Sequence, residues 1–470
     1  LVTGGLAALP ILGCAGADRL LYGGHPPGDA ARKIALTREL VAAMAPFLCL
    51  ICCAALLSAM LQAVRVFSVP AAMSCVLNLG FLGSFAYMAW AAHGADAERK
   101  IFYAAFAVVG AGLLQIVLQW PFLAWKGIRL RPRLSWSDPA VREILAAMGP
   151  TVIGLGVVQV NVLVDSLIDY VISLSVPGCE GANTFLYLGD RLMQLPLGVF
   201  GVAVATTAFP YLASHVARGD HRSFLQGVQE AMRMVIFVVL PASVGLAMVA
   251  DPLVRLIFQK PDLKFTDASV YQTAAVLACY SAGLVFFSLQ QILTRSFYAL
   301  RNYSTPVRIA GWMVLVNLGL NLLLIQIPDP YRRLAGVQIE GMPGPQLGVA
   351  GLALSTTLTA ILNVLLLWGR LRREMQPRVG ELWGKTAGDL VWAAGRIALG
   401  SALMGVFVYF SVNSIPYEPE LAIRLERALV PIALGILGYY GICLVIPIPE
   451  MEEFLRRRKK KEASQSPPLS

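Results

Sequence analysis

The hexapeptide R-V-F-S-V-P at residues 65–70 returns as R-N-Y-S-T-P at residues 301–306. Each copy leads into a long apolar segment that carries Asn-Leu-Gly, at residues 78–80 and 317–319. A long-range repeat in an apolar chain is typical of transporters built from two related halves, with the binding site between them. The fold therefore depends on how many membrane helices separate the two copies.

The composition is typical of a protein that crosses a membrane many times. Hydrophobic residues make up 57% of the chain and charged residues 14%, and the mean hydropathy is +0.66, whereas a soluble surface needs far more charge. Apolar runs of about 20 residues predict helices, because a helix satisfies its own backbone hydrogen bonds in the hydrocarbon. We predict an all-α polytopic protein with twelve spans, at residues 1–17, 40–64, 69–92, 101–125, 148–176, 184–213, 231–258, 268–298, 305–327, 348–370, 389–413 and 428–448.

The position of the repeat predicts two lobes. The first copy joins the second and third predicted spans, and the second copy joins the eighth and ninth. An even offset of six helices preserves orientation, so the repeats are parallel six-helix units. If spans five to ten form one complete lobe, the other lobe needs two more helices at its start. We therefore expect an N-terminally truncated sequence, which agrees with a first residue of Leu1 rather than Met.

Basic residues are distributed unevenly between the two sets of loops. The loops on one side hold 10 Lys and Arg residues, whereas the loops on the opposite side, which include residues 126–142, 370–385 and 456–461, hold 21. The positive-inside bias makes that side cytoplasmic and places the C-terminus there. Topology and contact with anionic phospholipids then explain the net charge of +10, so we expect no nucleic-acid partner.

No sequence pattern indicates enzymatic chemistry. The eight cysteines lie mainly in apolar segments and the four histidines lie in loops on both sides of the membrane, so neither a disulfide framework nor a metal site is predicted. The sequence contains no Walker A motif, nucleophile elbow or paired His-Glu motif. We therefore expect no enzyme activity, no ATP-driven transport and no cofactor.

Charged residues inside predicted helices are candidate site residues, because each costs about 2.5–3.5 kcal/mol at the bilayer centre unless it faces a cavity or a partner. Asp165 and Asp169 lie one turn apart on one helix face, and Asp190 and Arg191 lie near the start of the next predicted helix. Two interpretations stay open on spacing alone. The charges line a water-filled interior, or they form an ion-paired clamp in which Arg191 reaches the outer interface.

The segment Y-L-G-D-R-L-M-Q-L-P-L-G-V-F-G-V-A-V-A-T-T-A-F-P, residues 187–210, resembles the signature of the MurJ (MviN) family of lipid II flippases in the MOP exporter superfamily. F-Y-A-L-R-N-Y-S-T-P-V at 297–307, M-G-P at 148–150 and Q-V-N-V-L-V-D at 159–165 add to the similarity. The resemblance covers essentially the whole chain in order. It implies a two-lobed MOP-type fold of fourteen helices, of which this chain supplies about twelve, starting at the third.

The resemblance also implies a function. Such a protein moves the undecaprenyl-linked peptidoglycan precursor lipid II from the cytoplasmic to the outer leaflet of the bacterial inner membrane by alternating access, without covalent chemistry. Cell-wall synthesis proteins are further expected partners. The expected driving force is a coupling ion or the membrane potential, since an inside-negative potential favours outward movement of an anion by about 2.3 kcal/mol per charge per 100 mV.

Roles for individual residues follow from the resemblance. Arg191 matches an arginine that the family uses in its central cavity, where a planar guanidinium would bind the pyrophosphate through two parallel hydrogen bonds. Asp190 would hold the rotamer of that guanidinium, and Gln194, one turn further, would point into the same cavity. Asp165 is a further candidate for substrate binding, and Asp165 and Asp169 are candidates for binding a coupling ion.

A second group of residues is predicted to act in gating. Pro196, Gly198 and Gly201 permit either a bend that alternates between two conformations or plain close helix packing. Arg301 and Asn302 lie in the cytoplasmic turn of the second repeat. Asn302 stands where the family pattern leads us to expect Asp, which argues against charge-dependent gating at this turn.

The resemblance divides the chain into four parts. These are an incomplete N-lobe at residues 1–138 (family helices 3–6), a C-lobe at 139–373 (helices 7–12), two additional helices at 374–448 (13–14) and a basic cytoplasmic tail at 449–470. Further cavity arginines of the family fall in its first two helices, so we expect an incomplete binding site in the sequence as given. The two additional helices are expected to line a groove for the lipid tail.

Three alternatives remain at this point. A drug or cation antiporter of the same superfamily would share the architecture but would depend on cavity carboxylates rather than on Arg191. A flippase for another polyprenyl-linked saccharide is the second alternative. A membrane-embedded glycosyltransferase or polymerase would need large outward loops, whereas the predicted outward loops are short.

Overall fold

The computed structural model of the chain describes residues 28–64, 66, 68–90, 96–128, 182–259, 265–324, 348–416, 418 and 420–445. These residues form helices joined by turns and contain no strand, which confirms the all-α prediction. The chain forms two compact units, Leu1–Asp138 and Pro139–Ser470. Each unit is described by itself.

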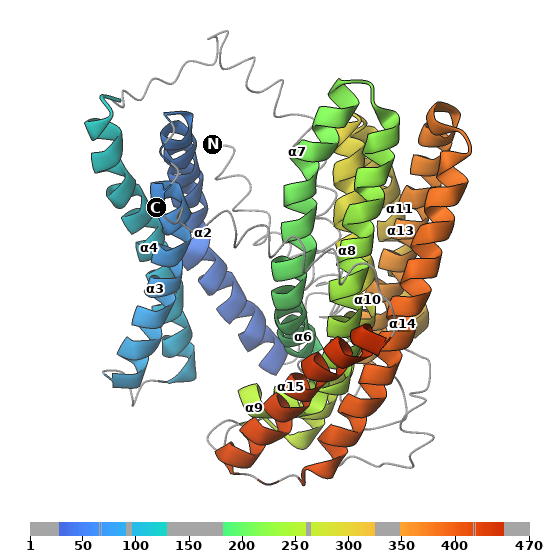
Figure 1. Ribbon diagram of the computed structural model, residues 1–470. Coiled ribbons are helices and arrows are strands. Elements are labelled where there is room, and N and C mark those ends of the chain that lie inside the picture. Colours follow the sequence, from blue (N-terminus) through green and yellow to red (C-terminus); the bar gives the residue numbers. More distant parts are fainter. Residues whose placement is uncertain are drawn as a thin grey trace, which may run out of the picture. The chain divides into compact units, whose positions relative to one another are not determined.

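The first unit contains three long helices, α2 (Gly28–Ala63), α3 (Ser68–Trp90) and α4 (Ala97–Trp125), coloured blue to cyan in Figure 1. Helix α4 packs against both of the others. Its fully buried Gln119 donates to the carbonyl oxygen of Ala54 and accepts a hydrogen bond from Ser58, so it ties α4 to α2. Such polar contacts matter in a membrane, because lipid gives helices little hydrophobic reason to associate.

The second unit is a larger bundle, coloured green to red in Figure 1. Helix α10 (Asp267–Ala299) lies at its centre and packs against α8 (His221–Met248) and α13 (Val349–Val379). Fully buried side chains such as Phe224 and Phe297 fill the core. The remaining elements are α6 (Ala182–Pro196), η1 (Leu197–Val202), α7 (Ala203–Ala217), α9 (Ala250–Phe258), α11 (Ser304–Leu324), α14 (Leu382–Ser414) and α15 (Leu421–Val445).

Ten helices in the described part of the chain are long and apolar enough to cross a membrane. They correspond to ten of the twelve predicted spans, while the spans at 1–17 and 148–176 lie outside the described residues. One predicted span was wrong, because the segment at 231–258 is divided into two helices, α8 (His221–Met248) and the short α9 (Ala250–Phe258), which meet at Val249. Helix α8 also starts ten residues before the predicted span, because its first turns are polar and hydropathy does not report them as part of a membrane helix.

The second Asn-Leu-Gly lies in α11 and has a packing role. Asn317 is buried and donates to Thr359 of α13 at 3.4 Å, and it accepts a hydrogen bond from Asn321 at 3.1 Å. Ser355 of α13 donates to Asn321 in turn. In the first copy it is the glycine that packs, because a Cβ at Gly80 would lie 2.8 Å from the Cβ of Ala111 on α4.

Candidate functional site

The polar residues of α6 form one hydrogen-bonded group. Gln194 lies at its centre, since its carbonyl oxygen accepts from the Arg191 guanidinium at 3.1 Å and its amide donates to the Asp190 carboxylate at 2.5 Å. Spacings of three and four residues bring these side chains together on one helix surface. Asp190 is thus linked to the guanidinium by hydrogen bonds through Gln194.

The Arg191 guanidinium is also held by an aromatic ring. It lies 4.8 Å from the ring centroid of Tyr187, one turn earlier in α6. Arg191, Gln194 and Tyr187 are all exposed on the surface of this unit. An arginine side chain has five N–H donors, and the described hydrogen bond uses one of them. The arrangement therefore presents an oriented cation with free donors to an anion.

Helix geometry changes directly after Pro196. The residues Leu197–Val202 form the π-helix η1, and the α-helix then resumes as α7. Proline lacks the N–H that would continue the ladder and crowds the preceding turn, which is a common cause of such irregularity. A π-turn takes about one residue more than an α-turn, so α7 is rotated by about 100° relative to an unbroken α-helix.

The two glycines of this segment differ in their surroundings. Gly201 is buried, and a Cβ there would lie 2.5 Å from the Ser288 hydroxyl of α10. Gly198 is exposed and has no atom within 4 Å of the position of a Cβ among the described residues. Of the two predicted roles, close helix packing therefore applies to Gly201. The gating role proposed for Gly198 and Pro196 stays a prediction.

The turn between α10 and α11 is built by Arg301 and Asn302. Arg301 adopts a left-handed conformation, with φ of 59°, and the N–H groups of Arg301 and Asn302 bond to the carbonyl oxygens of Tyr298 and Phe297. This is the Schellman pattern that ends many helices, usually with glycine at the left-handed position. The Asn302 side chain accepts from the Thr305 N–H at 3.2 Å, at the start of α11.

The same asparagine also joins α13. Its amide donates to the Glu374 carboxylate at 3.1 Å. An aspartate at this position would place two carboxylates together, so Asn302 and Glu374 are a matched pair. The structure thus supplies a reason for the departure from the expected Asp, and no sequence signal links two residues this far apart in the chain.

One polar residue escaped the sequence reasoning. Arg295, near the end of α10, is half-buried and donates a hydrogen bond to the Thr206 hydroxyl of α7. A single arginine close to a helix end resembles an ordinary flanking charge. The signal that could have found it is its position inside the apolar span Asp267–Ala299.

Two predicted site residues, Asp165 and Asp169, lie outside the described residues. Within the described ranges, no group of three or more His, Cys, Asp or Glu side chains could hold a metal ion.

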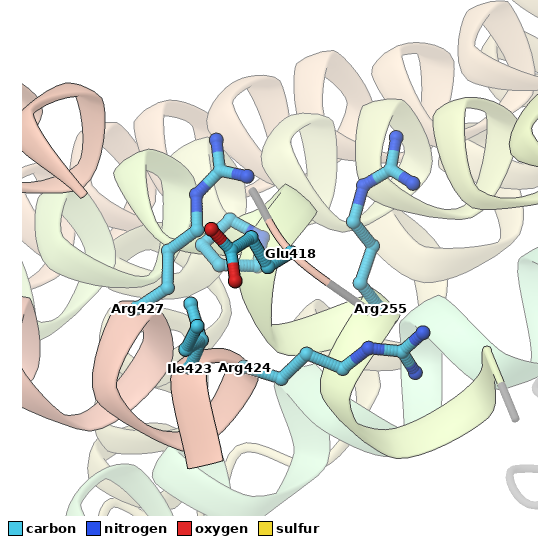
Figure 2. A pocket seen from close by; sticks show the side chains of 6 residues that line it. Arg255, Glu418, Ile423, Arg424 and Arg427 are labelled. Carbon is cyan, nitrogen blue, oxygen red and sulfur yellow. The ribbon is translucent and has the colours of Figure 1, made fainter. Parts of the chain in front are cut away.

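A small pocket lies at the end of the bundle that is predicted to face outward. Arg255 of α9 and Arg424 and Arg427 of α15 line it together with Glu418, as Figure 2 shows. Its volume of about 10 Å³ holds no more than about one water molecule. Arginines gathered around so little space join two helices rather than bind a headgroup.

The contacts of these arginines agree with that role. Burial lowers the pKa of Arg255, but its hydrogen bond to Asp267 and its pairing with Asp251 outweigh burial and raise the pKa above its usual value. Arg424 donates to the backbone oxygen of Gln259 at the end of α9. The cluster fixes α15 against α9.

A wider hollow lies at the elbow between α13 and α14, on the predicted cytoplasmic side. Its volume is about 510 Å³, and it is lined by Arg372, Gln376, Gly380, Glu381, Trp383 and Gly384. Further basic residues, Arg373, Arg378 and Lys385, are exposed nearby in the sequence. The elbow has the size and charge to receive an anionic headgroup.

Comparison with known proteins identifies the family. The model of the family described as lipid II flippase MurJ matches residues 1–417 of this chain. The chain belongs to the MurJ family. A probable lipid II flippase MurJ of Vibrio cholerae is 29% identical over 90% of this chain and 73% of its own length. The lipid II flippase MurJ of Burkholderia cenocepacia is 28% identical over 97% of this chain and 82% of its own length.

Solved structures support the fold. A lipid II flippase MurJ in an inward closed conformation matches with a TM-score of 0.66 at 19% identity, over 94% of this chain and 82% of its own. A MATE transporter of Vibrio cholerae matches with a TM-score of 0.50 at 15% identity, over 81% and 78%. The MurJ assignment and the ten apolar helices make this a multi-pass protein of the bacterial inner membrane. MurJ is a family of flippases and not of enzymes.

Proposed function

We propose that this MurJ protein flips lipid II from the cytoplasmic to the outer leaflet by alternating access. The observation that carries the proposal is the family match across residues 1–417. The exposed and oriented Arg191 guanidinium supports it, because a forked donor can bind phosphate oxygens through two parallel hydrogen bonds. Transport of this kind needs binding and conformational change, without covalent chemistry.

Roles for the α6 residues follow from their contacts. Arg191 binds the pyrophosphate, Gln194 orients the guanidinium, and Asp190 holds Gln194 in place through the 2.5 Å hydrogen bond. Removal of Gln194 or Asp190 would leave the charge but loosen its position, so both act as positioning residues. Asp165 stays a candidate for substrate binding, and together with Asp169 for binding a coupling ion.

Driving force and lipid contacts complete the proposal. The membrane potential moves the anionic headgroup outward at about 2.3 kcal/mol per charge per 100 mV. Anionic phospholipids occupy the hollow at the α13–α14 elbow, whose arginine and aromatic lining suits a phosphate headgroup at the membrane surface. The basic tail at 456–461 then lies on the cytoplasmic side.

The test is lipid II translocation in cells depleted of their own flippase. The full-length protein should restore lipid II to the outer leaflet, and Arg191→Ala should abolish the rescue at matched membrane levels. Arg308→Ala, at an exposed position in the first turns of α11, is the matched control and should leave rescue intact. A well-expressed parent protein that restores no lipid II would overturn the proposal. Rescue that survives Arg191→Ala would remove Arg191 from the substrate site.

Efflux of drugs or cations is the outcome to look for if rescue fails. The likeness to a MATE transporter concerns the fold alone, and the relatives reported above are lipid II flippases. Transport of another polyprenyl-linked saccharide would appear as rescue of a different envelope polymer.

A further inference from the structure

Helices α6 and α7 share one exposed stripe, which carries polar side chains at its two ends and which the π-helix brings into line. Gln194 follows Arg191 by three residues and Asp190 by four, and Gly198 follows Gln194 by four, so these residues share one face. An unbroken α-helix would carry Thr206 away from this face. The extra residue taken up by η1 rotates α7 by about 100° and returns Thr206 to the face of Gln194 and Gly198.

Burial supports this alignment. Gly189, Met193, Gly201 and Ala205 are buried along the opposite side of the same helices. Thr206 is exposed, as are Arg191, Gln194 and Gly198. The exposed stripe is therefore continuous from α6 into α7, with only apolar residues, Pro196 and glycines between Gln194 and Thr206, and the buried side is continuous against α10.

Helix α10 runs parallel to this pair of helices. A Cβ at Gly189 would lie 2.6 Å from Val276, and one at Gly201 would lie 2.5 Å from Ser288. Further along in the same direction, Thr206 bonds to Arg295. From the first contact to the third, the residue numbers increase in α6–α7 and in α10 alike, which shows that the helices are parallel. Arg191 and Thr206 are separated by roughly 20 Å along the axis, at 1.5 Å per residue.

Arg295 is an unusual residue for its place. It lies in the last turns of a helix that is long and apolar enough to cross a membrane, and no carboxylate among the described residues lies within ion-pair distance of it. An intramembrane cation without an acidic partner is costly, and such residues usually face a water-filled path or a ligand. The bond to Thr206 directs the guanidinium to the exposed stripe of α7.

We infer that Arg295, seated on Thr206, is a second pyrophosphate site at the cytoplasmic end of the stripe. It binds the diphosphate of a polyprenyl-linked headgroup before Arg191 does. Its guanidinium has four donors beyond the one used by Thr206, and the exposed Thr207 hydroxyl lies next in the sequence. The inference rests on the proposed function for the direction of movement, while the site itself requires only a pyrophosphate lipid.

Direct binding is the first test. Undecaprenyl pyrophosphate is titrated into the purified full-length protein, its Arg295→Gln and Arg295→Lys variants, and Thr206→Val. Arg295→Gln should weaken binding about tenfold, the usual size of a lost charge-assisted hydrogen bond. The affinity of Arg295→Lys should lie between those of the parent and Arg295→Gln, because lysine keeps the charge but lacks the forked pair of donors.

Arg308→Gln is the matched control. Arg308 also lies near the predicted cytoplasmic end of a helix and also bonds to a neutral hydroxyl, that of Ser304 at 3.1 Å. Its substitution should change affinity less than twofold. An equal loss in Arg308→Gln and Arg295→Gln would overturn the inference, because a general surface charge would then explain both. Thr206→Val carries the test if Arg295→Gln does not fold.

A second readout separates binding from a structural role. Thr207→Cys, in a background without the native cysteines, is labelled with a membrane-impermeant thiol reagent from the cytoplasmic side. Undecaprenyl pyrophosphate should slow labelling in the parent, and Arg295→Gln should abolish this protection. Phosphatidylglycerol at the same concentration should not slow labelling in the parent or in Arg295→Gln. Equal protection by phosphatidylglycerol would make this a general phospholipid contact and overturn the inference.

The two proposals fail in different ways. A protein that rescues no lipid II but binds undecaprenyl pyrophosphate through Arg295 refutes the proposed function and keeps this site. A protein that flips lipid II while Arg295→Gln binds like the parent refutes this site alone. Absence of any binding of the pyrophosphate lipid refutes this site, while the proposed function depends on rescue alone.

Discussion

The contrast between Gly201 and Gly198 gives the sharpest test of how η1 packs. Both lie in the same π-segment, so alanine changes their local backbone preference similarly. At Gly201 the new Cβ would lie 2.5 Å from the Ser288 hydroxyl and 3.0 Å from its Cβ, whereas at Gly198 no described atom lies within 4 Å. Gly201→Ala should therefore overpack the contact with α10, and Gly198→Ala should not.

The expected magnitude follows from two opposing effects. Alanine stabilises a helix by about 0.5–1 kcal/mol relative to glycine, and Gly198→Ala should show this gain. Overpacking a tight contact costs about 1–3 kcal/mol, so Gly201→Ala should lose roughly 0–2.5 kcal/mol after the same gain is subtracted. The difference between the two variants equals the overpacking cost alone, about 1–3 kcal/mol.

Unfolding of both variants in one detergent, by heat or denaturant, measures this difference. The companion change Ser288→Ala removes the nearest atom and should recover part of the loss in Gly201→Ala. Ser288 is fully buried and its hydroxyl donates to the Leu284 carbonyl oxygen at 2.9 Å, so its own replacement is a necessary control. Equal stability of the two glycine variants would refute the packing assigned to η1.

Other predictions concern the turns. Asn302→Asp should lower the free energy of unfolding by about 1.5–3 kcal/mol at pH 7, because it removes a hydrogen bond to the Glu374 carboxylate and adds a like charge; Glu374→Gln in the same protein should restore the loss. Arg301→Gly should raise the melting temperature, since a left-handed residue costs about 1–2 kcal/mol outside glycine, and an unchanged value would contradict the Schellman assignment. The Ser223 contacts hold the pKa of Asp220 below its usual value, so its carboxylate stabilises the fold above about pH 4 and this contribution disappears as pH falls further. Asp220→Ala should therefore melt earlier than the parent at pH 7, and the gap should close in acid.

Hydropathy and the repeat predict much of the fold from the sequence alone. A membrane helix satisfies its own backbone hydrogen bonds, so the position of a span depends on local composition. Ten predicted spans accordingly correspond to described helices. The polar start of α8 at His221 was missed for the same reason, because its helix continues beyond the apolar stretch. Local hydropathy thus predicts which segments form helices, whereas capping and packing determine where each helix begins and ends.

The site was less accessible to sequence reasoning. Arg191, Asp190 and Gln194 are close in sequence and could be grouped by helical spacing. The pairs Arg295 with Thr206 and Asn302 with Glu374 come from different helices, and spacing carries no information about such contacts. The π-turn after Pro196 shifts the helix phase, so a helical wheel drawn with α geometry misplaces every residue of α7.

The π-helix η1 also bears on how such a chain tolerates insertions and deletions. Since the segment Leu197–Val202 holds about one residue more than α-turns would need, the loss of one residue there returns it to α geometry and keeps both flanking helices in place. The same loss within α8 or α10 would displace every later side chain from its face. The shortened segment would therefore also keep Thr206 on the face of Gln194. A protein with that deletion would fold and would keep Thr206 within reach of Arg295 on α10.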